Sequence, residues 1–370
     1  MCRTSGAVLI LAVGALLTAC AGRTVPESVL DTPQAHCQAG MQLLEEQRVE
    51  EARAEFEYAL GLDDEYAPAY HGLGLVELAW GQGEEAERQF RRALSRDRTF
   101  APAHVGLGRA FRMQEEYERA VDAFEDGIEA NPRHAPAYDW LGRTQIDLRD
   151  FGAAVDAYAR GISALPDDPD LNAGWQRTSE IQRATLGIPD RYVEIALSEA
   201  VDRAEMAVLL NEMLDLGRIF DPKRSPEAQR FRPPGQQEQP AERSAMATDV
   251  PSGHWARVQV ENCVKYGAMD LMPDGSFRPT QVVSRQEMAM LVQRVLVVAW
   301  NDPSLRSKYF GSTSPFPDVP GTHFAFNAVA LATGRGIMSG RPDGTFFPEG
   351  TIPGHEAILI VRNLKGALQP

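Results

Sequence analysis

The residues that most often carry enzyme chemistry are scattered in this sequence. Its seven histidines form no His-x-x-x-His or Glu-x-x-His arrangement, and no Gly-x-Ser-x-Gly elbow, phosphate loop or dinucleotide fingerprint occurs. Asp274 and Asp343 each precede a glycine, which is expected in turns for backbone reasons. Too few oxygen ligands surround them for a calcium site. The sequence therefore predicts a protein that is not an enzyme and that has no cofactor and no metal site.

Two arginines stand out at the starts of apolar helices. They occur in Asp202-Arg203-Ala204-Glu205 and in Ser284-Arg285-Gln286-Glu287. Asp or Ser followed three residues later by Glu is a capping box, which satisfies free amides at a helix start. The box accounts for the Asp, Ser and Glu residues but not for Arg203 or Arg285. A third tetrapeptide, Pro353-Gly354-His355-Glu356, has no arginine.

These tetrapeptides belong to a pattern of helix, turn-rich loop and helix. Two copies share an aromatic residue 12 positions before a glycine, then a Pro-Asp-Gly turn, then a glutamate that opens an apolar helix. A shorter first copy has the aromatic, the glycine and the glutamate but lacks the turn. The aromatic and glycine pairs are Trp175 and Gly187, Trp255 and Gly267, and Phe324 and Gly336.

A second repetition, with a period of 34 residues, occupies residues 67–168. Alanine followed by proline recurs at Ala67, Ala101 and Ala135, and Leu-Gly pairs return at the same interval. A weaker copy occupies residues 33–66, so we count about four. A fixed period of this length is typical of a solenoid, in which stacked helix pairs bury a continuous core. Generic helical hairpins are the alternative interpretation.

This pattern resembles the tetratricopeptide repeat, most closely in residues 101–134. In that family the first helices of the pairs line a concave groove that binds a protein or peptide. The resemblance implies that three arginines lie on this face, where they could bind carboxylates by paired hydrogen bonds. An acidic or C-terminal peptide is therefore the expected ligand, and a solvated face without a ligand is the alternative. The implied groove positions are His71, Leu75, Val105, Arg109, Arg112, Met113, Asp139, Arg143 and Ile146.

The C-terminal pattern resembles the S-layer homology module, whose Asp-Val-Pro and His-Trp-Ala motifs match Asp249-Val250-Pro251 and His254-Trp255-Ala256. That family carries a Thr-Arg-Ala-Glu motif whose arginine meets an anionic, pyruvylated cell-wall polysaccharide. The resemblance implies that the module binds such a glycan. The alternative is a degenerate module that serves as a scaffold or binds protein. The implied glycan-binding residues are Arg203, Trp255, Asp274, Arg285 and Asp343.

Residues 1–19 predict an export signal, because Arg3 precedes an apolar run that is too short to span a bilayer. The ending at Cys20 resembles a lipobox. In bacterial lipoproteins the thiol of this cysteine carries a diacylglycerol and its new amino group is acylated, so we expect lipidation of Cys20 and anchoring by lipid alone. Ala21 is not the aspartate that retains lipoproteins in the inner membrane, which implies the periplasmic face of the outer membrane. An ordinary signal with an incidental cysteine is the alternative.

Composition agrees with an exported protein of several modules. The 370 residues exceed one ordinary domain, and a hydrophobic share of 44% can form buried cores. The formal net charge of −15 argues against nucleic acid as a partner. Cys37 and Cys263 belong to different modules and follow no metal spacing, so a disulfide framework is not expected.

The sequence thus predicts a mainly all-α protein with a tetratricopeptide-repeat superhelix and a helical S-layer homology module with short turn-rich loops. We expect a cell-envelope lipoprotein that binds a protein partner and cell-wall glycan. A scaffold or assembly factor of the outer envelope, whose C-terminal module binds protein, is the alternative. The predicted segments are the signal peptide (1–19), a lipidated tether (20–32), tetratricopeptide repeats (33–168), a degenerate first S-layer homology repeat or repeat cap (169–217), a linker (218–247), a second S-layer homology repeat (248–298), a loop (299–315) and a third repeat (316–368).

Overall fold

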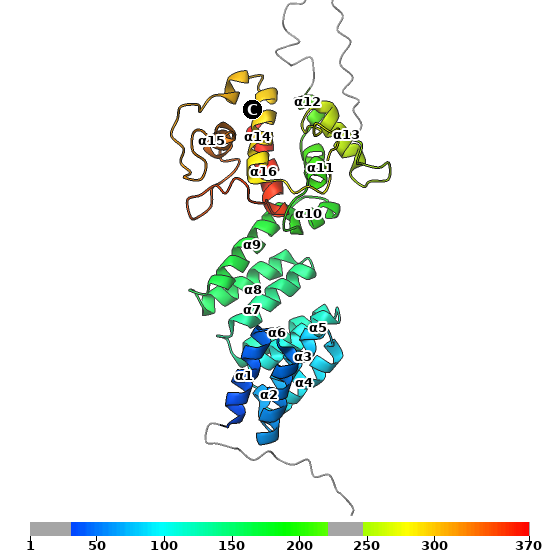
Figure 1. The fold of residues 1–370 in the computed structure, drawn as a ribbon, viewed down its shortest axis with the longest axis vertical. Helices are drawn as coiled ribbons and strands as arrows, with labels where there is room; N and C mark the ends of the chain where they lie inside the picture. The colour runs from blue at the N-terminus through cyan, green and yellow to red at the C-terminus, as the bar shows by residue number, and fades with distance from the viewer. Residues whose placement is uncertain (1–30, 221–246, 370) are drawn as a thin grey trace, which may run out of the picture. The chain divides into compact units, whose positions relative to one another are not determined.

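The computed structural model describes residues 31–220 and 247–369 (Figure 1). They belong to two compact units, Met1–Thr178 and Ser179–Pro370, which are described separately. The signal peptide, Cys20 and most of the expected linker lie outside the described residues. Within the described ranges the chain forms helices and no named strand, which confirms the all-α prediction. None of the described helices is both long enough and apolar enough to cross a bilayer.

The N-terminal unit repeats a pair of helices with the 34-residue period of the sequence. The first helix of each pair has 13 residues and the second has 14. The pairs are α1 (Pro33–Glu45) with α2 (Val49–Leu62), α3 (Ala67–Ala79) with α4 (Gly83–Arg96), α5 (Ala101–Met113) with α6 (Tyr117–Ala130), and α7 (Ala135–Asp147) with α8 (Phe151–Ala164).

Proline and the turn residues fix the ends of these helices. Each first helix has proline at its first or second position, where no intrahelical N–H is needed. Each turn within a pair places one residue in the left-handed region, with φ between 60° and 75°. Only one copy uses glycine there, since the four residues are Gln47, Gly81, Glu115 and Arg149.

Glycines let the helices approach buried aromatic rings within the N-terminal unit. A Cβ atom added to Gly72 would lie 2.2 Å from the ring of Phe56, and one added to Gly106 would lie 2.2 Å from the ring of Phe90. Both rings are fully buried. The alternation of glycine and aromatic in the 34-residue frame is therefore a packing requirement, because a larger residue would displace the ring.

Helix α9 (Pro169–Thr185) continues the frame beyond the fourth pair. Gly174 packs against Tyr158 as Gly72 does against Phe56, and Leu171 is fully buried in the same cluster as Tyr158. The boundary between the two units falls inside this helix, after Thr178. Trp175 lies within α9, whereas Trp255 precedes its helix. Trp175 and Trp255 therefore do not occupy equivalent positions in the structure, although they align in the sequence pattern.

The C-terminal unit is a helical assembly with one large hydrophobic core. Three of its helices, α11, α14 and α16, begin at the three tetrapeptides of the sequence pattern. The described helices of this unit beyond α9 are η1 (Asp190–Tyr192), α10 (Val193–Leu197), α11 (Arg203–Met213), α12 (Leu216–Ile219), α13 (Arg257–Tyr266), α14 (Arg285–Ala299), η3 (Pro303–Arg306), α15 (Phe326–Gly334) and α16 (Gly354–Ala367).

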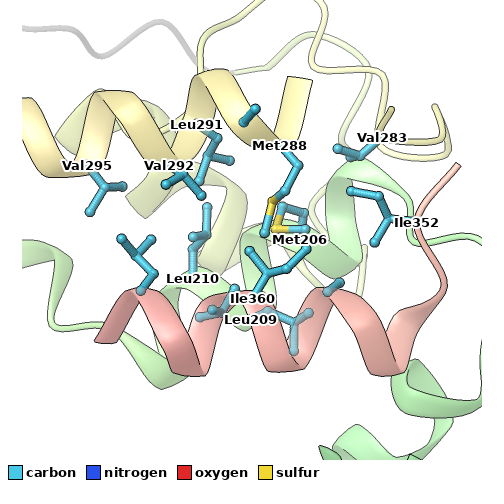
Figure 2. Packing of buried hydrophobic residues seen from close by; sticks show 14 of the residues in the cluster. Met206, Leu209, Leu210, Val283, Met288, Leu291, Val292, Val295, Ile352 and Ile360 are labelled. Atoms are coloured by element: carbon cyan, nitrogen blue, oxygen red, sulfur yellow. The ribbon is translucent and has the colours of Figure 1, made fainter. Parts of the chain in front are cut away.

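The core is built from matching positions of α11, α14 and α16 (Figure 2). Just before these helices, backbone hydrogen bonds join three extended segments: Val201 N–H donates to Ile352 O at 2.8 Å, and Val283 N–H donates to Val201 O at 2.9 Å. Arg285 N–H donates to Gly350 O at 2.9 Å, which completes the ring. The buried side chains that meet in Figure 2 are Met206, Leu209, Leu210, Val283, Met288, Leu291, Val292, Val295, Ile352 and Ile360.

Two segments expected to be irregular contain ordered structure. The linker was expected from residue 218, but α12 extends to Ile219. The loop of residues 299–315 contains η3, whose Leu305 is 2% exposed. The carbonyl of Leu305 accepts hydrogen bonds from the side chains of Gln293 and Asn327 at 3.0 and 2.8 Å. This loop is therefore part of the core of the C-terminal unit.

Candidate functional site

The N-terminal unit contains a groove of about 560 Å³, here called the Trp140 groove. It is lined mainly by apolar side chains, with arginines at one side. The lining residues are Met41, Leu44, Glu45, Leu75, Leu78, Ala79, Arg109, Arg112, Met113 and Trp140.

Three arginines surround the ring of Trp140. The guanidinium carbons of Arg109 and Arg112 each lie 5.0 Å from the ring centroid, and that of Arg143 lies 5.3 Å away. Such contacts attract a cation to the negative face of an aromatic ring. The structure therefore brings together the three arginines that the sequence placed on one face.

Carboxylates already pair with two of these arginines. Arg112 Nε donates to Asp147 Oδ2 at 3.1 Å, and Arg143 Nε lies 2.9 Å from Asp139 Oδ2. Asp139 also accepts a hydrogen bond from the hydroxyl of Tyr158 at 3.0 Å. Asp139 is therefore an internal partner of Arg143 and not a free groove residue.

Arg109 is the arginine of this groove without a carboxylate partner among the described residues. Its side chain is partly buried, and burial, together with the charge of Arg112, lowers its pKa below the ordinary value for arginine. Arginine remains protonated in proteins even so. An unpaired cation beside apolar side chains is thus the strongest anion-binding feature of the groove.

His71 does not line the Trp140 groove, contrary to the expectation from the sequence. Its ring contacts Phe100 edge-on at 5.6 Å and lies 5.7 Å from Phe90. Burial, with the nearby charge of Arg109, lowers the pKa of His71 to about 4. His71 is therefore neutral at pH 7 and belongs to the packing between helices.

Trp140 was not among the residues that the sequence singled out. In the 34-residue frame it occupies the position at which Gly72, Gly106 and Gly174 stand. A tryptophan at a position otherwise held by glycine is a departure that could have identified it.

In the C-terminal unit, Arg285 is an internal structural residue. It is 4% exposed, and its Nε and Nη2 donate to the carbonyls of Phe346 and Ser339 at 2.8 and 2.5 Å. Its Nη1 pairs with Glu356. The guanidinium also lies 4.9 Å from the ring of Phe346. This corrects the expectation that Arg285 faces a ligand, because all three of its nitrogens have partners inside the protein.

Arg203 makes the corresponding contacts but is less enclosed. Its Nε donates to Phe277 O at 2.7 Å and its Nη2 donates to Asp270 O at 2.8 Å. Among the described residues, Nη1 has no hydrogen-bond partner. Burial lowers the pKa of Arg203, while Glu287 and Asp270 act in the opposite direction.

Arg203 borders a pocket of about 210 Å³, here called the Arg203 groove. Its charged residues are Arg203, Asp270, Glu287 and Arg294. Asp270 Oδ2 pairs with Arg294 Nη2 at 2.5 Å, and Glu287 closes the capping box of Ser284, whose N–H donates to its carboxylate at 2.8 Å. Both carboxylates are therefore already bound. The full lining is Arg203, Ala268, Met269, Asp270, Leu271, Met272, Val283, Glu287, Met290, Leu291 and Arg294.

Asp274 and Asp343 organise the loops in which they lie. Asp274 accepts hydrogen bonds from the N–H and hydroxyl of Ser276 at 2.9 and 2.6 Å, and these bonds lower its pKa to about 2. Asp343 accepts the same two bonds from Thr345 at 2.9 and 2.7 Å. Their carboxylates are thus used to shape the turns.

The aspartates of the Asp-Val-Pro sequences in the last two copies, Asp249 and Asp318, hold these loops in place. Asp249 accepts the backbone N–H groups of Phe277 and Arg278, both at 2.7 Å. Asp318 accepts those of Phe346 and Phe347, the latter at 2.6 Å. The aspartate of the Asp-Val-Pro motif therefore binds the backbone just after the Pro-Asp-Gly turn.

Trp255 lies on the surface, with 61% of its area exposed. Its ring stacks on His254, with the centroids 6.0 Å apart, and the Nδ1 atom of His254 accepts the N–H of Ala256 at 3.2 Å. Phe324 is 71% exposed and stacks on His323 in the same way. These side chains present flat apolar surfaces to solvent.

The remaining candidates for metal binding or redox chemistry are dispersed or buried. Among the described residues, no three His, Cys, Asp or Glu side chains are grouped for a metal ion. Cys37 and Cys263 are buried free thiols, and burial raises the pKa of each to about 12. Each thiol therefore stays protonated at neutral pH and packs as a small apolar group.

Comparison with known proteins finds several proteins that are similar to parts of the chain. Cell surface glycoprotein 1 of Acetivibrio thermocellus is 38% identical over 89 residues, which are 24% of this chain and 4% of that protein. Outer membrane protein SlpA of Deinococcus radiodurans is 45% identical over 49 residues, 13% of this chain and 4% of that protein. The chain thus spans a small share of the length of these relatives. The solved structure of Pseudomonas aeruginosa pilF is 18% identical, with a TM-score of 0.38, and the match covers 51% of this chain and 84% of that one.

Two family models match parts of the chain directly. The tetratricopeptide repeat model matches residues 71–135 and 105–169, which cover the helix pairs from α3 to α8 of the N-terminal unit. The S-layer homology domain model matches residues 248–289 and 315–356, which include both Pro-Asp-Gly loops. The chain therefore contains tetratricopeptide repeats followed by two S-layer homology domains.

Proposed function

We propose that this protein is a non-catalytic lipoprotein of the bacterial cell envelope that attaches to cell-wall glycan and presents its repeats to a protein partner. The observation that carries the proposal is the presence of both families in one chain. Tetratricopeptide repeats bind peptides, and S-layer homology domains bind cell-wall glycan. Neither family is catalytic.

We further propose that residues 179–217 act as a first, degenerate S-layer homology copy. Their helix α11 begins with a capping box, in which Asp202 Oδ1 accepts the N–H of Glu205 at 2.8 Å, as α14 begins with that of Ser284 and Glu287. Arg203 contacts the second copy just as Arg285 contacts the third. These parallels support a module of three copies around one core.

For glycan attachment the proposed contact residues are Arg203 and Trp255. An Arg guanidinium with a free donor suits a carboxylate on a sugar, and an exposed indole suits the apolar face of a sugar ring. Arg285, Asp274 and Asp343 already make contacts within the protein and are not proposed as ligand contacts.

The test is co-sedimentation of the full chain with purified cell-wall sacculi. The parent should sediment with the sacculi, and Arg203→Gln should reduce the bound fraction at least tenfold. Arg218→Gln is a control that removes a charge from the same unit without changing the Arg203 groove. If the parent stays in the supernatant, attachment to glycan is wrong, and the module is then a scaffold that binds protein.

For the repeats, we propose that the Trp140 groove binds a largely apolar peptide segment that offers a carboxylate to Arg109. Asp147 and Asp139 already neutralise Arg112 and Arg143, so the groove does not offer three free cations to an acidic run. A pull-down from an envelope extract should lose its specific partners with Arg109→Glu. Arg149→Glu makes the same charge change at a turn outside the groove and should retain them.

Cys20 is the proposed site of lipid attachment and of anchoring to the periplasmic face of the outer membrane. Metabolic labelling with palmitate should mark the parent and not Cys20→Ser. Fractionation of the envelope should then move the variant from the membrane to the soluble fraction. A labelled Cys20→Ser variant would exclude this site.

A further inference from the structure

The two arginines of the C-terminal unit differ in one contact, and that contact decides whether each is available to a ligand. Both use Nε and Nη2 to hold the loop of the following copy. Nη1 of Arg285 is bound by Glu356, whereas Nη1 of Arg203 has no partner among the described residues. The difference therefore lies in the glutamate that each arginine faces.

The sequence around each glutamate explains why one pairs with an arginine and the other does not. Glu287, next to the Arg203 groove, accepts the N–H and the hydroxyl of Ser284 at 2.8 and 2.9 Å. The residue that corresponds to Ser284 in the last copy is Pro353, which has neither an N–H group nor a hydroxyl. Glu356 therefore cannot close a capping box and turns to Arg285 instead.

Burial agrees with this difference. The side chain of Arg285 is 5% exposed, and that of Glu356, which covers Nη1, is 31% exposed. Arg203 instead lines an open groove of about 210 Å³. An anionic group could reach Nη1 of Arg203 without breaking a salt bridge, whereas at Arg285 it would first have to displace Glu356.

The last copy has no arginine at the position that corresponds to Arg203 and Arg285. Gly354 replaces it, and a Cβ atom there would lie 1.4 Å from the carbonyl oxygen of Ile195 in α10. This helix occupies the place of the Pro-Asp-Gly loop that the first copy lacks. The first copy thus lacks the loop that an arginine at position 354 would hold, so the loop and the arginine are absent together.

We infer that the C-terminal unit has a single anion-binding groove, at Arg203, and that Pro353 and Glu356 close the corresponding groove at Arg285. The inference rests on the proposed attachment to glycan, and it specifies which part of the module binds and how many ligands it takes. The ligand class is a saccharide with a carboxylate substituent.

The test measures the number of ligands bound per chain by titration calorimetry. The probe is the soluble acidic oligosaccharide fraction released from the same sacculi, added to the full chain. The parent should bind about one equivalent, and Arg203→Gln should weaken binding at least tenfold. Glu356→Ala, which removes the carboxylate that covers Nη1 of Arg285, should raise the stoichiometry to about two.

Pro353→Ser provides a second route to the same result without removing the glutamate. Serine would restore the N–H and hydroxyl that occupy Glu287 in the second copy, and the backbone of Pro353, with φ −62° and ψ 150°, suits it. This variant should also gain a second equivalent. Glu349→Ala, which removes an exposed carboxylate from the same copy without a contact to Arg285, should still bind one.

The outcomes that would contradict the single-groove inference differ from those that would contradict glycan attachment. Two equivalents in the parent, or one equivalent in both folded Glu356→Ala and Pro353→Ser, would overturn the single-groove inference and leave glycan attachment intact. Undiminished binding by Arg203→Gln would overturn the inference in the same way. A parent that binds neither the oligosaccharide nor sacculi would overturn both proposals.

Discussion

At the scale of single residues, the same residue type serves different purposes according to its partners. Among the described residues, Arg109 and Arg203 make no salt bridge with a carboxylate, whereas Arg112, Arg143 and Arg285 do. The sequence shows where these arginines occur. Only the positions of their partners show which of them can accept a ligand.

His36 should make the stability of the first repeat depend on pH. Burial alone would lower its pKa, but hydrogen bonds to Glu55 and Asp31, at 2.6 and 2.5 Å, raise it above 6.5. The stabilisation is therefore fully present below pH 6.5 and is lost as pH rises through the raised pKa of the folded protein.

The measurement is the midpoint of urea unfolding for the N-terminal unit between pH 5.5 and 8.5. The midpoint should fall across this range in the parent, and the fall should be smaller in His36→Gln. Equal slopes for the two proteins would show that this histidine does not contribute.

At the scale of elements, close contacts between glycines and buried aromatic rings set the spacing of the repeat helices. Gly106→Ala should lower the free energy of unfolding by about 1–3 kcal/mol, because its Cβ would overlap the buried ring of Phe90. Denaturant unfolding followed by circular dichroism measures this change. Gly366→Ala, at an exposed helical position with no atom within 4 Å, should instead be neutral or stabilising by up to about 1 kcal/mol.

The loops of the S-layer homology copies depend on an aspartate far away in sequence. Asp318→Ala should cost about 2–3 kcal/mol, because it leaves the N–H groups of Phe346 and Phe347 without their charged acceptor. Asp343→Ala, which breaks only bonds within an exposed turn, should cost less than about 1 kcal/mol. Thermal unfolding of both variants tests the ranking.

The same aspartate should contribute to acid sensitivity. Partial burial would raise the pKa of Asp318, but the N–H groups of Phe346 and Phe347 outweigh it and hold the pKa below 3.8. Its contribution to stability is therefore present above pH 3.8 and lost as pH falls through the lowered value. In Asp318→Ala this part of the acid dependence should disappear.

Much of the helical architecture follows from sequence periodicity, because a strict 34-residue period indicates stacked pairs of helices. The capping boxes at Asp202 and Ser284 are equally readable, since their chemistry is local. Pairings such as Glu356 with Arg285, or Asp318 with Phe347, join residues about 30 to 70 positions apart and leave no local pattern. These pairings decide the binding groove, and for that reason the site was harder to predict than the fold.

At the scale of the whole molecule, the two units differ in how local their contacts are. Helix pairs of the N-terminal unit contact their neighbours along the chain, whereas the ring in the C-terminal unit joins Val201 to Ile352. Contacts between residues distant in sequence slow folding, because a long loop must close first.

During refolding, the amide hydrogens of the two units should therefore become protected from exchange at different times. In pulse-labelling hydrogen exchange after dilution from denaturant, the amides of α3 to α6 should be protected before those of α11, α14 and α16. Simultaneous protection would mean that the ring forms as fast as the repeats. The comparison is internal to one sample, so it needs no second protein.

The ring also depends on α16, the last of the described helices. The segment before α16 supplies Ile352 O and Gly350 O, which accept the N–H groups of Val201 and Arg285, and α16 adds Ile360 to the central packing. A chain that stopped short of α16 could still carry folded repeats, but its C-terminal core would stay open. Closure of the ring therefore links the beginning and the end of the C-terminal unit, so that loss of α16 would also undo the packing of α11 and α14.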